Sequence, residues 1–155
     1  MKFQALIDAA IEARLAAYAP YSKFQVGAAL LCDDGQIITG CNVENLSYGL
    51  TICAERNAIF AAVAGGQQKF DAIAIAADTE KAISPCGACR QVMCEFGDFP
   101  VILSNLDGEV VESTVGELLP RGQTGILDLD RDESAQAQEE AEADEDTSAT
   151  PQRRG

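Results

Sequence analysis

Four residues suited to metal chemistry lie in two short segments of this chain. Cys53 and Glu55 are two positions apart, and Cys86 and Cys89 form a Cys-x-x-Cys pair that directly follows Pro85. The sequence contains no histidine, so no imidazole can act as a catalytic base or bind a metal. A transition-metal site must therefore use thiolates, and a proton carrier must be a carboxylate, lysine, tyrosine or cysteine side chain.

Three thiolates suit a catalytic zinc ion, one per chain, because such an ion takes three protein ligands and leaves one position for water. Cys53, Cys86 and Cys89 are the candidate ligands, and both predicted helices at these positions would aim positive N-termini at the anionic cluster. Arg56 is placed to offset the remaining negative charge. Glu55 is too near Cys53 to be a ligand on the same helical face, but it can take a proton from the activated water and pass it on.

Other sites also use the Cys-x-x-Cys spacing. A thioredoxin-like redox pair would need only the two cysteines. A structural zinc site would need a fourth thiolate, and the remaining cysteines are Cys32, Cys41 and Cys94. The Cys53-x-Glu55 segment at a predicted helix start and the proline before Cys86 favour the catalytic interpretation. The two segments match the pattern of zinc-dependent base deaminases, which pair a His- or Cys-x-Glu segment with Pro-Cys-x-x-Cys.

Composition limits the partners of the chain. Its 155 residues have a formal net charge of -14, and neither residues 1–125 nor residues 126–155 offer the basic stripe that binding to a phosphate backbone requires. We therefore expect no nucleic-acid partner. Residues 1–8 lack a signal-peptide apolar run, and no stretch of about 18 apolar residues is present to span a membrane. We expect a cytoplasmic protein without a membrane partner, whose thiols stay reduced.

Hydrophobic periodicity and turn residues predict alternating helices and strands. Helices are expected at 2–18, 51–64 and 86–96, with a last helical turn at 114–119. Strands are expected at 26–32, 36–40, 70–77, 101–104 and 109–113. This alternation indicates a layered α/β domain with a mixed sheet. Residues 1–125 form the predicted catalytic domain.

The remaining residues, 126–155, differ sharply in composition. They hold ten carboxylates against three arginines and no aromatic residue. Such a segment has too little apolar surface to offset its ordering entropy. We predict a disordered acidic tail.

Four longer motifs extend the match beyond the cysteines. Residues 18–29, 40–45, 48–56 and 84–91 resemble the small homotetrameric cytidine deaminases, and the resemblance spans about residues 4–120. It implies a three-layer α/β/α sandwich with a mixed sheet of about five strands. It also implies a homotetramer whose active sites are shared between subunits. The all-cysteine ligand set resembles that of the tetrameric branch of the family, since the dimeric branch uses a histidine ligand.

The resemblance also implies substrate contacts. Asn42 and Glu44 match the pair that holds the ribose 3′-hydroxyl, and Phe24 matches an aromatic residue that packs on the pyrimidine or sugar. The backbone N–H of Ala54 matches the donor to the base carbonyl. Tyr48 matches a residue that reaches into the active site of a neighbouring subunit. Ordinary structural roles are the alternatives: Phe24 in the core, Asn42 and Glu44 capping a turn, and Tyr48 in interface packing.

The implied reaction is hydrolytic deamination of free cytidine and 2′-deoxycytidine to uridine and 2′-deoxyuridine in pyrimidine salvage, with ammonia released. Zinc-activated hydroxide would attack C4, while Glu55 would protonate N3 and then the departing amine. The alternatives are a deaminase of another aminopyrimidine nucleoside, such as blasticidin S, and a non-catalytic structural zinc protein. One position departs from the family pattern: Gln123 stands where a phenylalanine commonly stacks on the base.

Overall fold

The computed structural model describes residues 2–123, so the predicted acidic tail lies outside the described residues. The helices are α1 (Gln4–Arg14), α2 (Ala54–Ala64), α3 (Gly87–Cys94) and α4 (Val115–Leu118), with the short 3-10 helix η1 (Tyr48–Leu50). The strands are β1 (Val26–Cys32), β2 (Ile37–Cys41), β3 (Phe70–Ala77), β4 (Pro100–Asn105) and β5 (Val110–Thr114). None of the helices in this part of the chain has the length and apolar character needed to cross a membrane.

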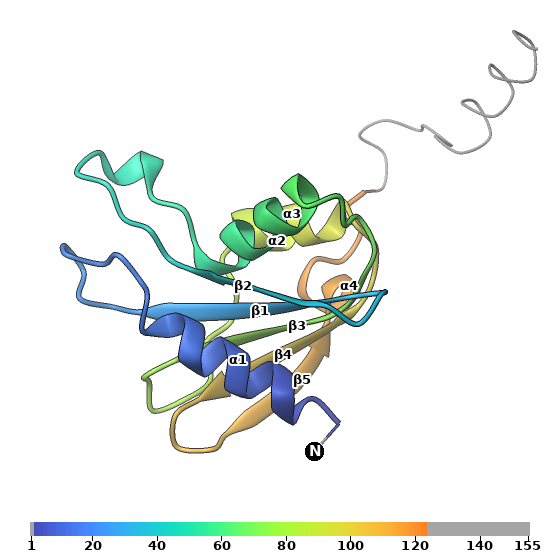
Figure 1. The fold of residues 1–155 in the computed structure, drawn as a ribbon, viewed down its shortest axis with the longest axis horizontal. Helices are drawn as coiled ribbons and strands as arrows, with labels where there is room; N and C mark the ends of the chain where they lie inside the picture. The colour runs from blue at the N-terminus through green and yellow to red at the C-terminus, as the bar shows by residue number, and fades with distance from the viewer. Residues whose placement is uncertain (1, 124–155) are drawn as a thin grey trace, which may run out of the picture. The chain divides into compact units, whose positions relative to one another are not determined.

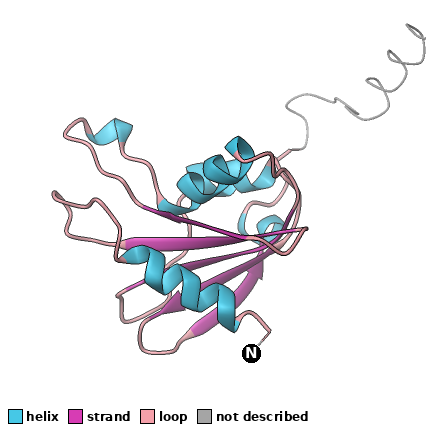
Figure 2. Cartoon of the chain, viewed as in Figure 1, coloured by secondary structure: helices cyan, strands magenta, loops and turns pink. Residues whose placement is uncertain are grey.

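The strands form one five-stranded sheet in the order β2-β1-β3-β4-β5 (Figure 1). Strands β3 and β4 are parallel, and the other neighbouring pairs are antiparallel. Helix α1 covers one face of the sheet, and α2 and α3 lie on the other (Figure 2). The predicted α/β class and the mixed sheet of five strands are confirmed.

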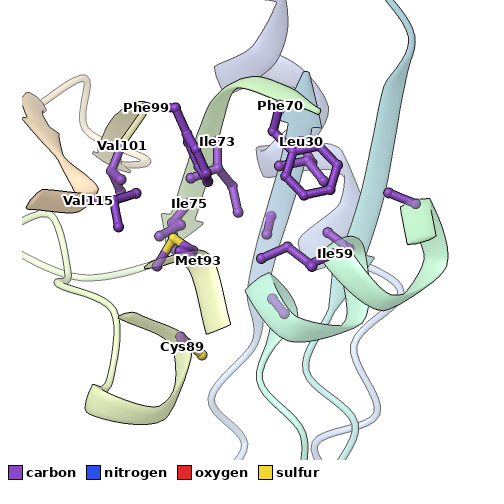
Figure 3. Packing of buried hydrophobic residues seen from close by; sticks show 14 of the residues in the cluster. Leu30, Ile59, Phe70, Ile73, Ile75, Cys89, Met93, Phe99, Val101 and Val115 are labelled. Atoms are coloured by element: carbon purple, nitrogen blue, oxygen red, sulfur yellow. The ribbon is translucent and has the colours of Figure 1, made fainter. Parts of the chain in front are cut away.

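The two faces of the sheet carry side chains of different size. Along β3, Ile73 and Ile75 point to the α2–α3 face, whereas the alternating alanines 72, 74 and 76 lie beneath α1. The larger side chains pack with Ile59 of α2 and Met93 of α3, as Figure 3 shows. Burying a branched aliphatic side chain contributes about 1.5–3 kcal/mol, so this face anchors the two helices that carry the candidate site.

Two glycines let the helices approach the sheet closely. A Cβ at Gly27 of β1 would overlap the backbone oxygen of Ala10 in α1. A Cβ at Gly40 of β2 would overlap the backbone nitrogen of Ala58 and lie 2.5 Å from the backbone oxygen of Ala54, both in α2. Because these neighbours are backbone atoms, a side chain at either glycine would push a whole helix away from the sheet.

We predict that Gly40→Ala lowers the free energy of unfolding by about 3 kcal/mol, the upper range for overpacking a tight site. Urea denaturation measures the change. Gly49→Ala is the matched control, because nothing lies within 4 Å of a Cβ at Gly49, and its effect should stay within about 0.5 kcal/mol. Equal midpoints for the two variants would contradict the close approach of α2 to β2.

Two helix boundaries differ from the sequence prediction by more than two residues. The first helix ends at Arg14 rather than at residue 18, because Tyr18 pairs with the segment after β2: its N–H donates to Asn42 O at 3.0 Å, and its carbonyl accepts from Glu44 N at 2.8 Å. Helix α2 begins at Ala54 rather than residue 51. In both places, backbone pairing with the segment after β2 overrides local helix propensity.

The late start of α2 has a specific cause. Ile52 and Val43 exchange two backbone hydrogen bonds of 3.0 Å in an antiparallel bridge. This bridge keeps the chain extended up to Cys53, whose backbone is also extended. Cys53 therefore becomes the residue that caps α2 rather than one inside it.

Candidate metal centre and active site

The three predicted ligands converge at the starts of two helices. Cys53 is the N-cap residue of α2, Cys86 is the N-cap residue of α3, and Cys89 lies in the first turn of α3. The Sγ atoms of Cys53 and Cys86 are 3.8 Å apart, and those of Cys86 and Cys89 are 3.5 Å apart. All three sulfur atoms lie within 4.8 Å of one another. The structure thus brings together residues that are 33 positions apart in the chain.

This spacing fits a tetrahedral zinc ion. With Zn–S bonds of about 2.3 Å, tetrahedral geometry separates two sulfur ligands by about 3.8 Å. Among the described residues, the other three cysteines do not join the cluster, so a four-thiolate structural site finds no fourth sulfur there. A redox pair would not require Cys53 at this distance. Three converging thiolates are the donor set of a zinc site with one open position.

The surroundings of the cluster favour negative charge on sulfur. Neither Cys53 nor Cys86 makes a side-chain capping hydrogen bond. The backbone N–H groups in the first turns of α2 and α3 therefore keep their partial positive charge close to the sulfur atoms. A hydrogen bond from Cys89, followed by one from Arg56 at 3.4 Å, lowers the pKa of the Cys53 thiol to about 5. The same bond to Cys53, together with burial, raises the pKa of Cys89.

The predicted charge compensation by Arg56 has a direct contact to support it. Its Nη2 donates to Cys53 Sγ, and this bond raises the pKa of the guanidinium further. A permanent positive charge beside one sulfur offsets part of the charge that three thiolates would place on a metal. The role at zinc stays a prediction.

Glu55 lies in the first turn of α2 and is only 4% exposed. Burial raises the pKa of its carboxyl group. Hydrogen bonds, including one with the Cys89 thiol, partly oppose this rise. The carboxyl group therefore borders the sulfur cluster and is shielded from bulk water. Ala54, the residue before it, is fully buried. A carboxyl group in this position can receive and return a proton at the centre.

The residues predicted to hold a ribose form one hydrogen-bonded network. Asn42 Nδ2 donates to Phe24 O at 2.8 Å, and Asn42 Oδ1 accepts from Val26 N at 2.8 Å. The Glu44 carboxylate accepts from the backbone N–H of Tyr21 at 2.9 Å and from both the N–H and the hydroxyl of Ser22. Both side chains therefore organise the loop before β1, and their ribose contacts stay predictions.

Phe24 and Tyr48 are surface residues in this chain. Phe24 is 41% exposed, so the alternative that it belongs to the core of the chain does not apply. Tyr48 is 76% exposed, and its ring meets Tyr21 edge-on with centroids 6.0 Å apart. The two loops that carry Tyr21 and Tyr48 are thereby joined. No contact here tests the predicted role of Tyr48 in a neighbouring subunit.

Sequence reasoning missed Ser22. Its hydroxyl accepts from Phe24 N at 3.0 Å and donates to the Glu44 carboxylate. The hydrogen bond from Ser22 is the largest cause of the lowered pKa of Glu44. Ser22 thus links the backbone of Phe24 to Glu44. A loop serine between a tyrosine and a lysine carries no distinctive signal, and only the motif at residues 18–29 pointed to this region.

Comparisons with known proteins agree with this geometry. Residues 1–104 match the family model described as the cytidine and deoxycytidylate deaminase zinc-binding region. A cytidine deaminase of Sporosarcina psychrophila is 56% identical over 122 residues, which cover 77% of this chain and 90% of the relative. A blasticidin-S deaminase of Bacillus cereus is 33% identical over 107 residues, covering 64% and 76% respectively.

A solved structure matches over the same part of the chain. The crystal structure of a cytidine deaminase from Burkholderia pseudomallei is 54% identical, with a TM-score of 0.75. The match covers 77% of this chain and 98% of that chain.

Proposed function

This chain belongs to the cytidine deaminase family, and on that premise we propose that it hydrolyses free cytidine and 2′-deoxycytidine to uridine and 2′-deoxyuridine, with release of ammonia. The observation that carries the proposal is the convergence of Cys53, Cys86 and Cys89 beside the buried carboxyl group of Glu55. The 56% identity to a cytidine deaminase supports it. We place the reaction in pyrimidine salvage in the cytoplasm, where thiols stay reduced.

We propose that one zinc ion is held by the three cysteines in each chain. Bound zinc lowers the pKa of a water molecule and so makes it a nucleophile near neutral pH. Glu55 accepts a proton from the attacking water and delivers it to N3 of the pyrimidine ring. It then takes the proton of the new hydroxyl group at C4 and gives it to the exocyclic nitrogen, which leaves as ammonia while C4 becomes a carbonyl. Its burial keeps bulk water from competing for that proton. Arg56 and the two helix N-termini hold the cysteines as thiolates.

The remaining residues position the nucleoside. Asn42 and Glu44 bind the ribose 3′-hydroxyl. The Glu44 carboxylate can do so while it holds the loop before β1, because it has more acceptor sites than that loop uses. Phe24 packs on the pyrimidine or sugar, and the N–H of Ala54 donates to the base carbonyl. Tyr48 reaches the site of a neighbouring subunit.

We propose a homotetramer with shared active sites. Large apolar side chains are exposed on η1 and on the outer side of α2 in the single chain, including Leu50 at 65% and Phe60 at 49%. An interface between copies would cover them. Light scattering tests the assembly, and a monomer at assay concentrations would contradict it.

A substrate panel with a zinc measurement tests the proposed activity. Purified protein should hold about one zinc per chain and consume cytidine and 2′-deoxycytidine with loss of their absorbance. Faster turnover of blasticidin S would overturn the choice of substrate, although the higher identity to cytidine deaminases favours cytidine. Zinc without turnover of any nucleoside would favour a structural zinc protein.

We predict that Ser22→Ala raises KM for cytidine about tenfold and leaves kcat nearly unchanged. The change removes a hydrogen bond to a charged group, worth about 1.5–3 kcal/mol, and frees Glu44 to move away from the ribose. Steady-state kinetics measure both constants. Ser47→Ala, also exposed but outside the Glu44 network, is the control and should match the unchanged protein. An altered kcat with normal KM would contradict this role.

A further inference from the structure

Arg90 directly follows the ligand Cys89 and joins three separate parts of the chain. Its Nε donates to Pro85 O at 2.8 Å, and its Nη2 donates to Ser84 Oγ at 2.7 Å. Its Nη1 donates to Leu118 O at 2.9 Å. Each guanidinium nitrogen thus has an oxygen partner, and none of these partners belongs to the sulfur cluster. This arrangement distinguishes Arg90 from Arg56, which donates to Cys53.

Two of these contacts fix the turn that leads into Cys86. Pro85 is buried and has no backbone N–H to donate, so Arg90 holds this residue through its carbonyl. Ser84 is exposed and is held through its hydroxyl. Since Cys86 follows immediately, the orientation of this turn sets where its sulfur lies relative to Cys89.

The third contact brings in the end of α4. Leu118 is the last residue of that helix, so its carbonyl has no intrahelical partner and accepts from Arg90 instead. The neighbouring Gln91 Nε2 donates to Gly122 O at 3.3 Å, and a Cβ at Gly122 would lie 2.7 Å from Cys94 Sγ. The segment after α4 therefore rests directly on α3, the helix that begins at the metal ligands.

We propose that Arg90 is a positioning residue for the metal centre: it locks the 84–86 turn and the end of α4 onto α3, so that the sulfur atoms of Cys86 and Cys89 are held ready for zinc. The inference rests on the zinc site of the proposed function. Residues that orient metal ligands without touching the metal change metal affinity by about 10- to 100-fold when removed.

The planar guanidinium is required for this role. It presents donors in a fixed fork that can reach three oxygens at once, whereas a lysine ammonium is a single point on a flexible stem. Arg90→Lys keeps the positive charge near the thiolates and loses the fork. It therefore separates positioning from simple charge compensation.

The test is zinc affinity of the full-length protein, measured by competition with a chromogenic chelator and independently of activity. Arg90→Ala should bind zinc about 10- to 100-fold more weakly than the unchanged protein, and Arg90→Lys should be weakened to a similar degree. Gln91→Ala is the matched control, because it loses a contact to the same C-terminal segment but none to the turn before Cys86. It should keep normal affinity.

The outcomes separate the alternatives. Normal zinc affinity in Arg90→Ala, or full recovery in Arg90→Lys, would overturn the proposal. If Arg90→Ala does not fold, as judged by circular dichroism with zinc present, Ser84→Ala replaces it. This change removes one of the two turn contacts and should weaken zinc binding by a few-fold, so unchanged affinity would again overturn the proposal. If the protein without any substitution binds no zinc, that result would instead overturn the proposed function itself.

Discussion

Glu55→Gln is expected to lower kcat for cytidine by about 10³-fold while zinc content stays near one per chain. The amide has almost the volume of the carboxyl group but cannot shuttle a proton, and general acid–base catalysis typically contributes 10²–10⁴-fold. Because Glu55 is buried and is not among the clustered ligands, the change should spare the metal site. Loss of cytidine absorbance measures the rate, and elemental analysis measures the zinc.

A matched change on the surface provides the control. Glu12 is an exposed glutamate of α1, away from the sulfur cluster, and Glu12→Gln should leave both rate and zinc unchanged. A fully active Glu55→Gln protein would show that another group carries the proton. Loss of zinc in that variant would show instead that Glu55 supports the metal site.

The strands of the fold were predictable because their pattern is local. The apolar runs at 26–32 and 70–77 coincide with β1 and β3 at both ends. Both strands are buried inside the sheet and covered on both faces, so each is a nearly continuous apolar run that stands out in the sequence. The helix boundaries were less predictable, since backbone pairing of Tyr18 and Ile52 with the segment after β2 decides them.

The metal cluster was predictable from residue type, because without histidine only cysteine could supply soft ligands. Its supporting contacts were not. Ser22 meets Glu44 across 22 positions, and Arg90 meets Leu118 across 28. A serine or an arginine has many ordinary roles, so neither residue type indicates such a partner. Only the folded chain shows that Asn42 and Glu44 hold the loop before β1.

Removing a ligand should have the largest effect on the centre. We predict that Cys86→Ala and Cys89→Ala each lower zinc affinity by more than about 100-fold, because losing a ligand costs more than losing a residue that supports one. Activity toward cytidine should fall below detection in both, since the activated water is lost. Chelator competition and cytidine turnover measure the two effects.

The two variants should differ in the stability of the zinc-free protein. Cys86 is exposed, whereas Cys89 is fully buried and belongs to the same core cluster as Met93 (Figure 3). Cys89→Ala therefore also leaves a small cavity, costing about 1 kcal/mol of unfolding free energy, while Cys86→Ala should cost little. Cys41→Ala is the control, because Cys41 lies outside the sulfur cluster. Weaker zinc binding after Cys41→Ala would contradict a three-cysteine site, since it would reveal a fourth contributing thiol.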